Sequence, residues 1–575
     1  MTDDKFIKIL RLWLLTTMIT TLIISGVTLC FSYIKPPKFY RNSISFTMEA
    51  VNPLMLQNPI SKCTPPLINY PVPFPENLFL TNTENSYCNF IQAPKLEPYL
   101  LPAPILHNEK KAAPTWLELK ITYLRKGIFT VAEGVFTASI IMIAILFLPG
   151  RFIHNIGRTP IIMCCISLII CMVNFFATNY NSYALDVPGH TNYIKFLATY
   201  WRLPEPFGWQ TQQPPAYYII GAILYKIGGW IGMPDPFNMV RCSSLLLYGG
   251  FIILSLLILK EYLSGKSYIA AAALVLFWPD GYHYAARISN DLGMLFLISL
   301  TLYLMIRWWK TENSHYLIAG FFIAFFSITV KGNGVIAIAA VAALASIALH
   351  KKKISWRILV NPYLLVFSIT CIGINFGRTF YYRMKGADVK WFLNLNTQSM
   401  QSILHMRAPY NFLYFDFLSF IRDPFYMSQP DGGIYLWNAF LKTLILGEWT
   451  WQSPMLACTL SFLLVIFLIF ILSYLFLKPR MNSTELCPPL AIMMLCMLAM
   501  LISACIAVPW TAQANGRYIF GIIVIFSIYL MKSLEWHYRQ GRRLLYYTGM
   551  GSVILFPILS IFLNISELAL KYPAW

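Results

Sequence analysis

The first candidate for chemistry is a polar, aromatic and proline-rich stretch, Asp186 to Tyr218, which follows an apolar run ending near Thr178. It carries an acid, Asp186, with His190 four residues on and Gln213 near its end. A positioned carboxylate can take the proton of a hydroxyl as that hydroxyl attacks, which is general-base chemistry. We therefore predict Asp186 as the base that deprotonates an acceptor hydroxyl, and His190 and Gln213 as side chains that orient the base or the substrate.

Further ionisable side chains stand at the ends of later apolar runs. Arg287 and Asp291 lie in HYAARISND, Lys331 precedes Gly332-Asn333, and Arg517 lies in QANGRY. Ionisable groups near a bilayer are costly, so they tend to face a cavity and each other. Because Arg and Lys bind phosphate well, we predict that these three basic residues bind an anionic lipid-linked substrate and that Asp291 orients it.

The same side chains also have structural interpretations, which the sequence leaves open. Asp186 precedes Val-Pro-Gly and could belong to a turn or a helix cap, and Asp291 could be the N-cap of its span. His190 could be an ordinary hydrogen-bonding residue. The three basic residues could reach toward the membrane surface or anchor helix ends.

Composition defines the class of protein. Of 575 residues, 57% are hydrophobic and 12% are charged, and apolar runs of about 18 or more residues recur, as in a polytopic helical membrane protein. The net charge of +20 fits a cytoplasmic excess of Lys and Arg, and we exclude nucleic acid as a partner. The twelve cysteines show no zinc-ligand spacing. We predict no metal ligands and no certain cofactor, with a divalent metal left as an open alternative.

The elements that must position these residues are apolar helices. Thirteen spans are expected, near 12–34, 128–148, 160–178, 240–260, 268–285, 291–308, 316–330, 334–349, 358–377, 455–477, 489–508, 518–534 and 545–563, with the C-terminus outside. Four regions follow: an anchor span, proline-rich loop and second span (1–159), a catalytic core (160–377) with its first loop at 179–239, an external loop or cap (378–454), and C-terminal helices (455–575).

Charge decides how residues 215–232 are placed. If that apolar segment lies on the outer surface, the runs with most Lys and Arg, such as Lys351-Lys352-Lys353, fall inside; if it spans, they fall outside. The positive-inside rule favours the first arrangement. It places loops 35–127, 179–239 and 378–454 outside. Cys63 and Cys88, in the first of these loops, are then predicted to form a disulfide.

The ordered motifs resemble the GT-C superfamily of membrane glycosyltransferases, which includes protein O-mannosyltransferases and lipid A aminoarabinose transferases. The matching residues span about 160–535 and are Asp186, His190, Leu203-Pro204, Pro214-Pro215, Tyr217-Tyr218, Arg241, Ser289-Asn290-Asp291, Lys331 and Gly516-Arg517-Tyr518. Some members carry two adjacent acids in this first loop, whereas Val187 follows Asp186 here. The resemblance implies an all-α GT-C-like bundle whose external loops carry short helices. It also implies a catalytic Asp and inversion at the anomeric carbon.

The resemblance also implies a polyprenyl-phosphate-sugar donor lipid, so we expect a glycosyltransferase that acts on a glycan, lipid or protein acceptor among membrane lipids. We expect it in a bacterial inner membrane, with the site facing the periplasm. A transporter or flippase for a lipid-linked glycan is the alternative from another class. A glycan ligase or polymerase would use the same carrier.

Overall fold

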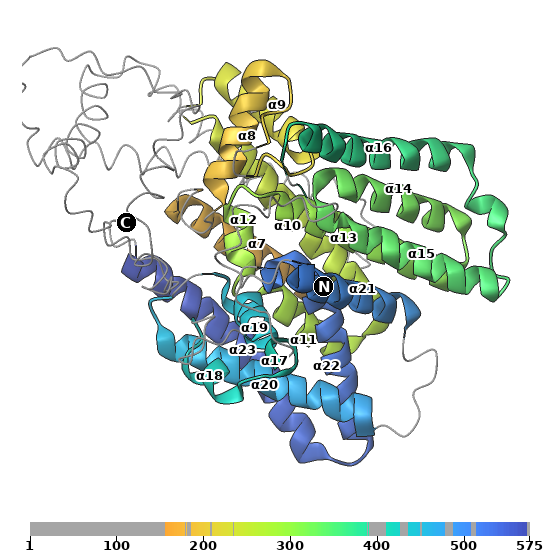
Figure 1. The fold of residues 1–575 in the computed structure, drawn as a ribbon. Coiled ribbons are helices and arrows are strands. Elements are labelled where there is room, and N and C mark those ends of the chain that lie inside the picture. The colour runs from red at the N-terminus through yellow and green to blue at the C-terminus, as the bar shows by residue number, and fades with distance from the viewer. Residues whose placement is uncertain are drawn as a thin grey trace, which may run out of the picture. The chain divides into compact units, whose positions relative to one another are not determined.

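The computed structural model describes residues 156–178, 180, 186–206, 210–233, 235–387, 389, 410–425, 435–448, 451–477, 487–507 and 513–571. The first two expected spans, loop 35–127 and the expected Cys63–Cys88 disulfide lie outside these residues. The described chain is helical (Figure 1). Its site-forming first half contains α7 (Arg158–Ala177), α8 (Val187–Tyr200), α9 (Ala216–Trp230), α10 (Phe237–Tyr262), α11 (Gly265–Leu276), α12 (Gly281–Ala286), α13 (Asn290–Thr311), α14 (Ser314–Val330), η2 (Gly332–Gly334), α15 (Val335–His350), η3 (Trp356–Ile358) and α16 (Pro362–Met384).

The second half adds short helices and then long ones. They are α17 (Tyr410–Leu413), α18 (Phe417–Arg422), α19 (Leu436–Leu446), α20 (Pro454–Leu477), α21 (Pro488–Ala507), η6 (Gly516–Ile519), α22 (Ile522–Arg539) and α23 (Arg543–Lys571). The short helices α17 to α19 fall in the region expected to carry them. Nearly every residue of α19 is buried, so this helix belongs to the core and not to the surface.

Eight helical segments in the described part of the chain are long and apolar enough to cross a membrane: α7, α10, α13, Gly332–His350, α16, α20, α21 and α23. This confirms the expected all-α polytopic class of membrane protein. Three other expected spans fall on helices that do not meet that measure. Helix α11 has 12 residues, α14 has 17, and α22 carries Lys532, Glu535 and Arg539. The total of thirteen spans stays a prediction.

The expected span 268–285 is two helices and not one. Helix α11 ends at Leu276 and α12 begins at Gly281. The break contains Pro279, which lacks an N–H group and disfavours helical geometry in the residue before it. The peptide N–H of Asp280 instead donates to the carbonyl of Ile445 in α19, at 3.1 Å. The break thus ties the α11–α12 connection to a buried helix from the second half of the chain.

Helix α14 packs against α13, α15 and α16, and α21 packs against α15 and α13 (Figure 1). Helix α10 packs on α13 and α9, while α20, α22 and α23 pack on one another. The buried core includes Trp278 and Trp308. Trp278 Nε1 donates to the carbonyl of Leu444 at 2.6 Å, which is a second tie to α19.

Ion pairs join the ends of the helices that lie away from the candidate site. Glu261 near the end of α10 pairs with Arg307 at 3.0 Å and with Lys310 at 2.8 Å, near the end of α13. Lys353 after α15 pairs with Glu312 after α13, at 2.6 Å. The C-termini of α10, α13 and α15 therefore meet at one basic end, and these three helices run in the same direction.

The opposite ends of α7 and α10 meet each other. Arg241 in the first turns of α10 donates from Nη2 to Thr178 Oγ1, just beyond α7, at 2.9 Å. The segment that connects α7 to α10 therefore begins and ends at the same end of these two helices. Helix α9, with 15 residues, lies within that segment and is not among the membrane-crossing candidates.

Candidate active site

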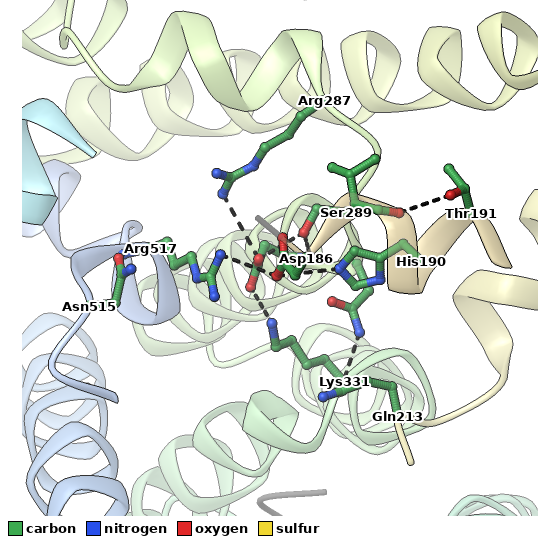
Figure 2. Close-up of polar contacts among 12 residues, drawn as sticks. Asp186, His190, Thr191, Gln213, Arg287, Ser289, Lys331, Asn515 and Arg517 are labelled. Carbon is green, nitrogen blue, oxygen red and sulfur yellow. Dashed lines mark hydrogen bonds and ion pairs between the residues drawn. The ribbon is translucent and has the colours of Figure 1, made fainter. Parts of the chain in front are cut away.

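The sequence-predicted polar residues come together where several elements end. They lie at the starts of α8, α9 and α13, between α12 and α13, directly after α14, and in η6. Figure 2 shows Asp186, Arg287, Lys331 and Arg517 pointing toward one another from these separate elements. All seven predicted site residues are buried or nearly so: Asp186, His190, Gln213, Arg287, Asp291, Lys331 and Arg517.

Asp186 is placed by the start of α8 but does not cap it. The residue adopts a helical backbone conformation and its side chain makes no capping hydrogen bond. Oδ2 lies 3.2 Å from Arg517 Nη1 and 3.5 Å from His190 Nε2 (Figure 2). Burial raises the pKa of the carboxyl, but Arg517 and His190 outweigh that effect and hold the pKa well below its usual range. Asp186 therefore lies in a turn at the N-cap position without a capping side-chain bond, and its carboxylate is buried beside Arg517 and His190.

His190 is held by the tyrosines that follow the Pro-Pro pair. Nδ1 lies 2.8 Å from Tyr218 Oη, and the two rings are stacked. Tyr218 in turn stacks on Tyr193 with 3.9 Å between ring centroids. Helix α9 thus fixes the histidine ring from one side, while α8 places it one turn after Asp186. This arrangement leaves His190 Nε2 facing the carboxylate.

Asp291 lies in the first turn of α13 but is not its N-cap. Ser289 is the N-cap, and its Oγ accepts from the Asp291 N–H at 3.2 Å. The same hydroxyl lies 2.7 Å from Asp291 Oδ2 and is placed to donate to it, and Lys331 Nζ contacts Oδ1. Arg287 Nη2 is 3.9 Å from Oδ2. The N-cap interpretation of Asp291 is wrong, because Ser289 holds that position, and the Asp291 carboxylate faces Lys331 and Arg287.

Neither basic partner of Asp291 reaches toward a surface. Lys331 is 7% exposed and Arg287 is 3% exposed. The Arg287 guanidinium stacks over the Tyr284 ring at 4.2 Å, and Lys331 Nζ lies 5.0 Å from the centre of the Tyr518 ring. Such cation–π contacts support a cation that is withdrawn from water. The expectation that these residues could be surface-reaching is therefore not met.

Gln213 lies at the edge of this group of residues. Within the described ranges its side chain contacts Asn290 and none of the charged side chains of the site. Asn290 Nδ2 donates to Gln213 Oε1 and to the carbonyl of Val330, both at 3.4 Å. Val330 is the last residue of α14, directly before Lys331. Gln213 therefore connects the first loop to the junction that carries Lys331.

Arg517 is positioned by η6 and α19. Asn515 caps η6 through its side chain, which accepts from the Arg517 N–H at 3.0 Å. The Gly516 N–H donates to Thr443 Oγ1 in α19 at 2.8 Å. Arg517 Nη1 contacts both Asp186 and Glu448, the second at 3.5 Å, so the side chain is not a simple helix-end anchor.

Glu448 is the functional candidate that sequence reasoning missed. It follows α19, its side chain is 9% exposed, and Asn515 Nδ2 donates to Oε1. Burial raises the pKa of this carboxyl against the lowering effect of Arg517. No motif surrounds it in the sequence, where it stands as one of several scattered charges in 378–454. Only its contact with the Gly-Arg-Tyr triplet reveals it.

The cluster has open hydrogen-bonding capacity. Asp186 Oδ1 and Arg517 Nε are buried, and neither makes a hydrogen bond in the described part of the chain. A buried polar atom without a partner typically costs about 1–3 kcal/mol, so native proteins rarely keep one without a reason. A proton acceptor and a cationic donor are thus left unsatisfied on two side chains that already contact each other.

The donor set of the cluster does not resemble a metal site. No group of three or more His, Cys, Asp or Glu side chains with metal-ligand geometry occurs within the described ranges. Asp186 and Asp291 instead face guanidinium and ammonium groups. We therefore assign no metal ligands.

The fold and the site define a polytopic helical membrane protein with three acids and three bases buried together at one end of its helices. No family model matches the chain, and no curated protein matches it in sequence. Among solved structures, the chain is similar to the crystal structure of ArnT from Cupriavidus metallidurans bound to undecaprenyl phosphate. The identity is 11%, the similarity covers 72% of this chain and 77% of that chain, and the TM-score is 0.43.

Proposed function

We propose that this protein is a membrane glycosyltransferase of the GT-C type, which moves a sugar from a polyprenyl-phosphate donor to an acceptor hydroxyl outside the cytoplasm. The observation that supports it most is that Asp186 and Arg517, which contact each other inside a buried charged cluster, each keep an unsatisfied polar atom, Oδ1 and Nε. This pair offers a base for a hydroxyl and a donor for a phosphate. Four residues of the ordered motifs that resemble the GT-C superfamily belong to the cluster: Asp186, Asp291, Lys331 and Arg517.

The reaction needs one proton transfer and one displacement. The acceptor hydroxyl oxygen attacks the anomeric carbon, and its proton passes to Asp186 Oδ1. The bond between the anomeric carbon and the phosphate oxygen breaks, and its electron pair leaves with the carrier phosphate. Arg517, Lys331 and Arg287 stabilise the charge that develops on that phosphate. His190 orients the carboxylate, since its ring is fixed by Tyr218.

The basic residues at the far ends of the helices support the side of the membrane on which the site lies. The basic residues at the end opposite the cluster include Arg307, Lys310 and Lys353. Basic residues prefer the cytoplasmic side. The cluster therefore faces away from the cytoplasm in this proposal, where an acceptor glycan, lipid or protein would reach it.

Asp186→Asn tests the proposal, because the amide keeps the shape of the side chain and removes the base. Product formation should fall by about 10²–10⁴-fold, the usual contribution of a general base, while binding of undecaprenyl phosphate survives. Mass spectrometry of glycolipids and glycoproteins from cells that make each variant measures the product. Glu205→Gln, an exposed acid of the same loop, is the matched control and should keep the wild-type level.

Three outcomes separate the alternatives. Near-normal product from Asp186→Asn would reject Asp186 as the base. Translocation of a lipid-linked glycan with no new glycosidic bond would indicate a flippase. Transfer of a preassembled chain and not of one sugar would indicate a ligase or polymerase.

A further inference from the structure

Glu448 shares one guanidinium nitrogen with the proposed base. Arg517 Nη1 lies 3.2 Å from Asp186 Oδ2 and 3.5 Å from Glu448 Oε2. In the described part of the chain, the other close contact of the Glu448 carboxylate is with a neutral donor, Asn515 Nδ2. Two buried carboxylates therefore compete for one cation, and a bound phosphate would be a third anion at the same place.

Charge balance makes that competition consequential. The three acids of the cluster are Asp186, Asp291 and Glu448, and its three bases are Arg287, Lys331 and Arg517. With all six ionised, these side chains sum to zero. A carrier phosphate then adds uncompensated negative charge in a buried place, where such charge is strongly disfavoured. Uptake of one proton by an acid offsets one unit of that charge.

The contacts of the three acids single out which one takes the proton. Asp291 is satisfied by Lys331, the Ser289 hydroxyl and Arg287, so its carboxylate is the best held. Asp186 has Arg517 and His190. In the described part of the chain, the Glu448 carboxylate has one cationic contact, Arg517 Nη1 at 3.5 Å, whereas Asp186 lies closer to the same nitrogen, at 3.2 Å, and also contacts the His190 ring.

The field around Glu448 points the same way. Arg517 in η6 and its cap residue Asn515 contact Glu448. Asp186 before α8, Asp280 between α11 and α12, and Arg287 after α12 act on it electrostatically. The two aspartates raise the pKa of Glu448, in addition to its burial, and the two arginines lower it. Of the cluster acids, Glu448 is the most readily protonated when negative charge is added.

We propose that Glu448 takes up a proton from solvent when the carrier phosphate binds, which releases Arg517 toward the phosphate and leaves Asp186 ionised as the base. The proposal rests on the proposed function, since it takes the phosphate to be that of a polyprenyl lipid. Glu448 is a positioning residue, because it acts through Arg517 and does not contact the reacting atoms. Its proton is returned to solvent when the carrier leaves.

Infrared difference spectroscopy of the full chain in lipid, with and without undecaprenyl phosphate, tests this. Binding to the wild-type protein should produce a carboxylic-acid C=O band. The band should be absent in Glu448→Gln and present in Glu312→Gln, whose exposed acid pairs with Lys353 at the opposite end of the helices. In wild-type protein, side-chain ¹³C-labelled glutamate should shift the band and ¹³C-labelled aspartate should not, which keeps the test decisive if Glu448→Gln fails to fold.

Binding without a new acid band, a band that survives in Glu448→Gln, or a band that shifts with labelled aspartate would each overturn the proposal. These outcomes leave the glycosyltransferase function standing. If the wild-type protein does not bind undecaprenyl phosphate at all, both the proposed function and the role of Glu448 fail. The two failures are therefore distinguishable.

Discussion

At the residue scale, the buried ion pair of Lys331 and Asp291 has energetics that differ from those of a surface pair. Asp291 is 1% exposed and Lys331 is 7% exposed. The desolvation of two such charges offsets much of their attraction, so the pair as a whole adds little stability. Removing only one partner leaves an uncompensated buried charge, which is strongly unfavourable.

Lys331→Met should therefore destabilise the protein by about 3 kcal/mol or more, because Asp291 keeps its charge and loses its contact with Nζ. The double variant Lys331→Met/Asp291→Asn should recover much of that loss. Thermal unfolding in detergent measures both. A double variant less stable than the single one would show that Asp291 depends chiefly on Arg287 and Ser289.

The residue types of the site could be predicted from the sequence, but their partners could not. Acids and bases at the ends of apolar runs indicate a shared polar site, and Asp186, Asp291, Lys331 and Arg517 do meet. Glu448 was not predicted, because it lies in a region of many scattered charges where no local pattern distinguishes it. Only the packing of α19 against η6 places it beside Arg517.

At the scale of elements, the contact between η6 and α19 sets the position of Arg517. A Cβ atom added to Gly516 would lie 2.5 Å from Leu444 Cα and 2.6 Å from Leu444 N. These are backbone atoms of a buried helix and cannot move aside as the end of a flexible side chain can. Glycine is therefore required at position 516, because the α19 backbone at Leu444 lies too close for a Cβ atom.

Gly516→Ala should push η6 away from α19 and move Arg517 from both carboxylates. We expect a lower thermal unfolding temperature and weaker binding of undecaprenyl phosphate. Gly551→Ala in α23 is the matched control, since a Cβ atom there meets nothing within 4 Å. Equal behaviour of the two variants would refute the idea that this contact positions the arginine.

Hydropathy predicts helices well and predicts their interruptions poorly. The long apolar runs became α10, α13 and α20 with ends close to those expected, whereas α16 (Pro362–Met384) continues past the expected end at 377 into the region predicted as an external loop. The run 268–285 did not stay whole, because Pro279 ends the helical ladder and Asp280 finds its backbone partner in α19. A tertiary contact of that kind has no local signature in an apolar run.

At the scale of the whole described chain, the helices have two chemically different ends. One end gathers the paired acids and bases of the candidate site, and the other gathers Glu261, Arg307, Lys310 and Lys353. Successive helices that are joined by short connections, such as α13 and α14, run in opposite directions. The sequence alone indicated this order through the positive-inside rule, once 215–232 was taken not to span.

Cysteine labelling tests which end faces the cytoplasm. Lys195 in α8 and Lys352 after α15 are exposed and serve as reporter positions. In a background without other cysteines, a membrane-impermeant thiol reagent added to intact cells should label Lys195→Cys and leave Lys352→Cys unlabelled until the membrane is opened. The reason is that Thr178 and Arg241 hold the 179–236 segment at the site end, whereas Lys353 pairs with Glu312 at the other. Labelling of both positions from the same side would reject this topology, and labelling of Lys352→Cys alone would place the cluster of Asp186 in the cytoplasm.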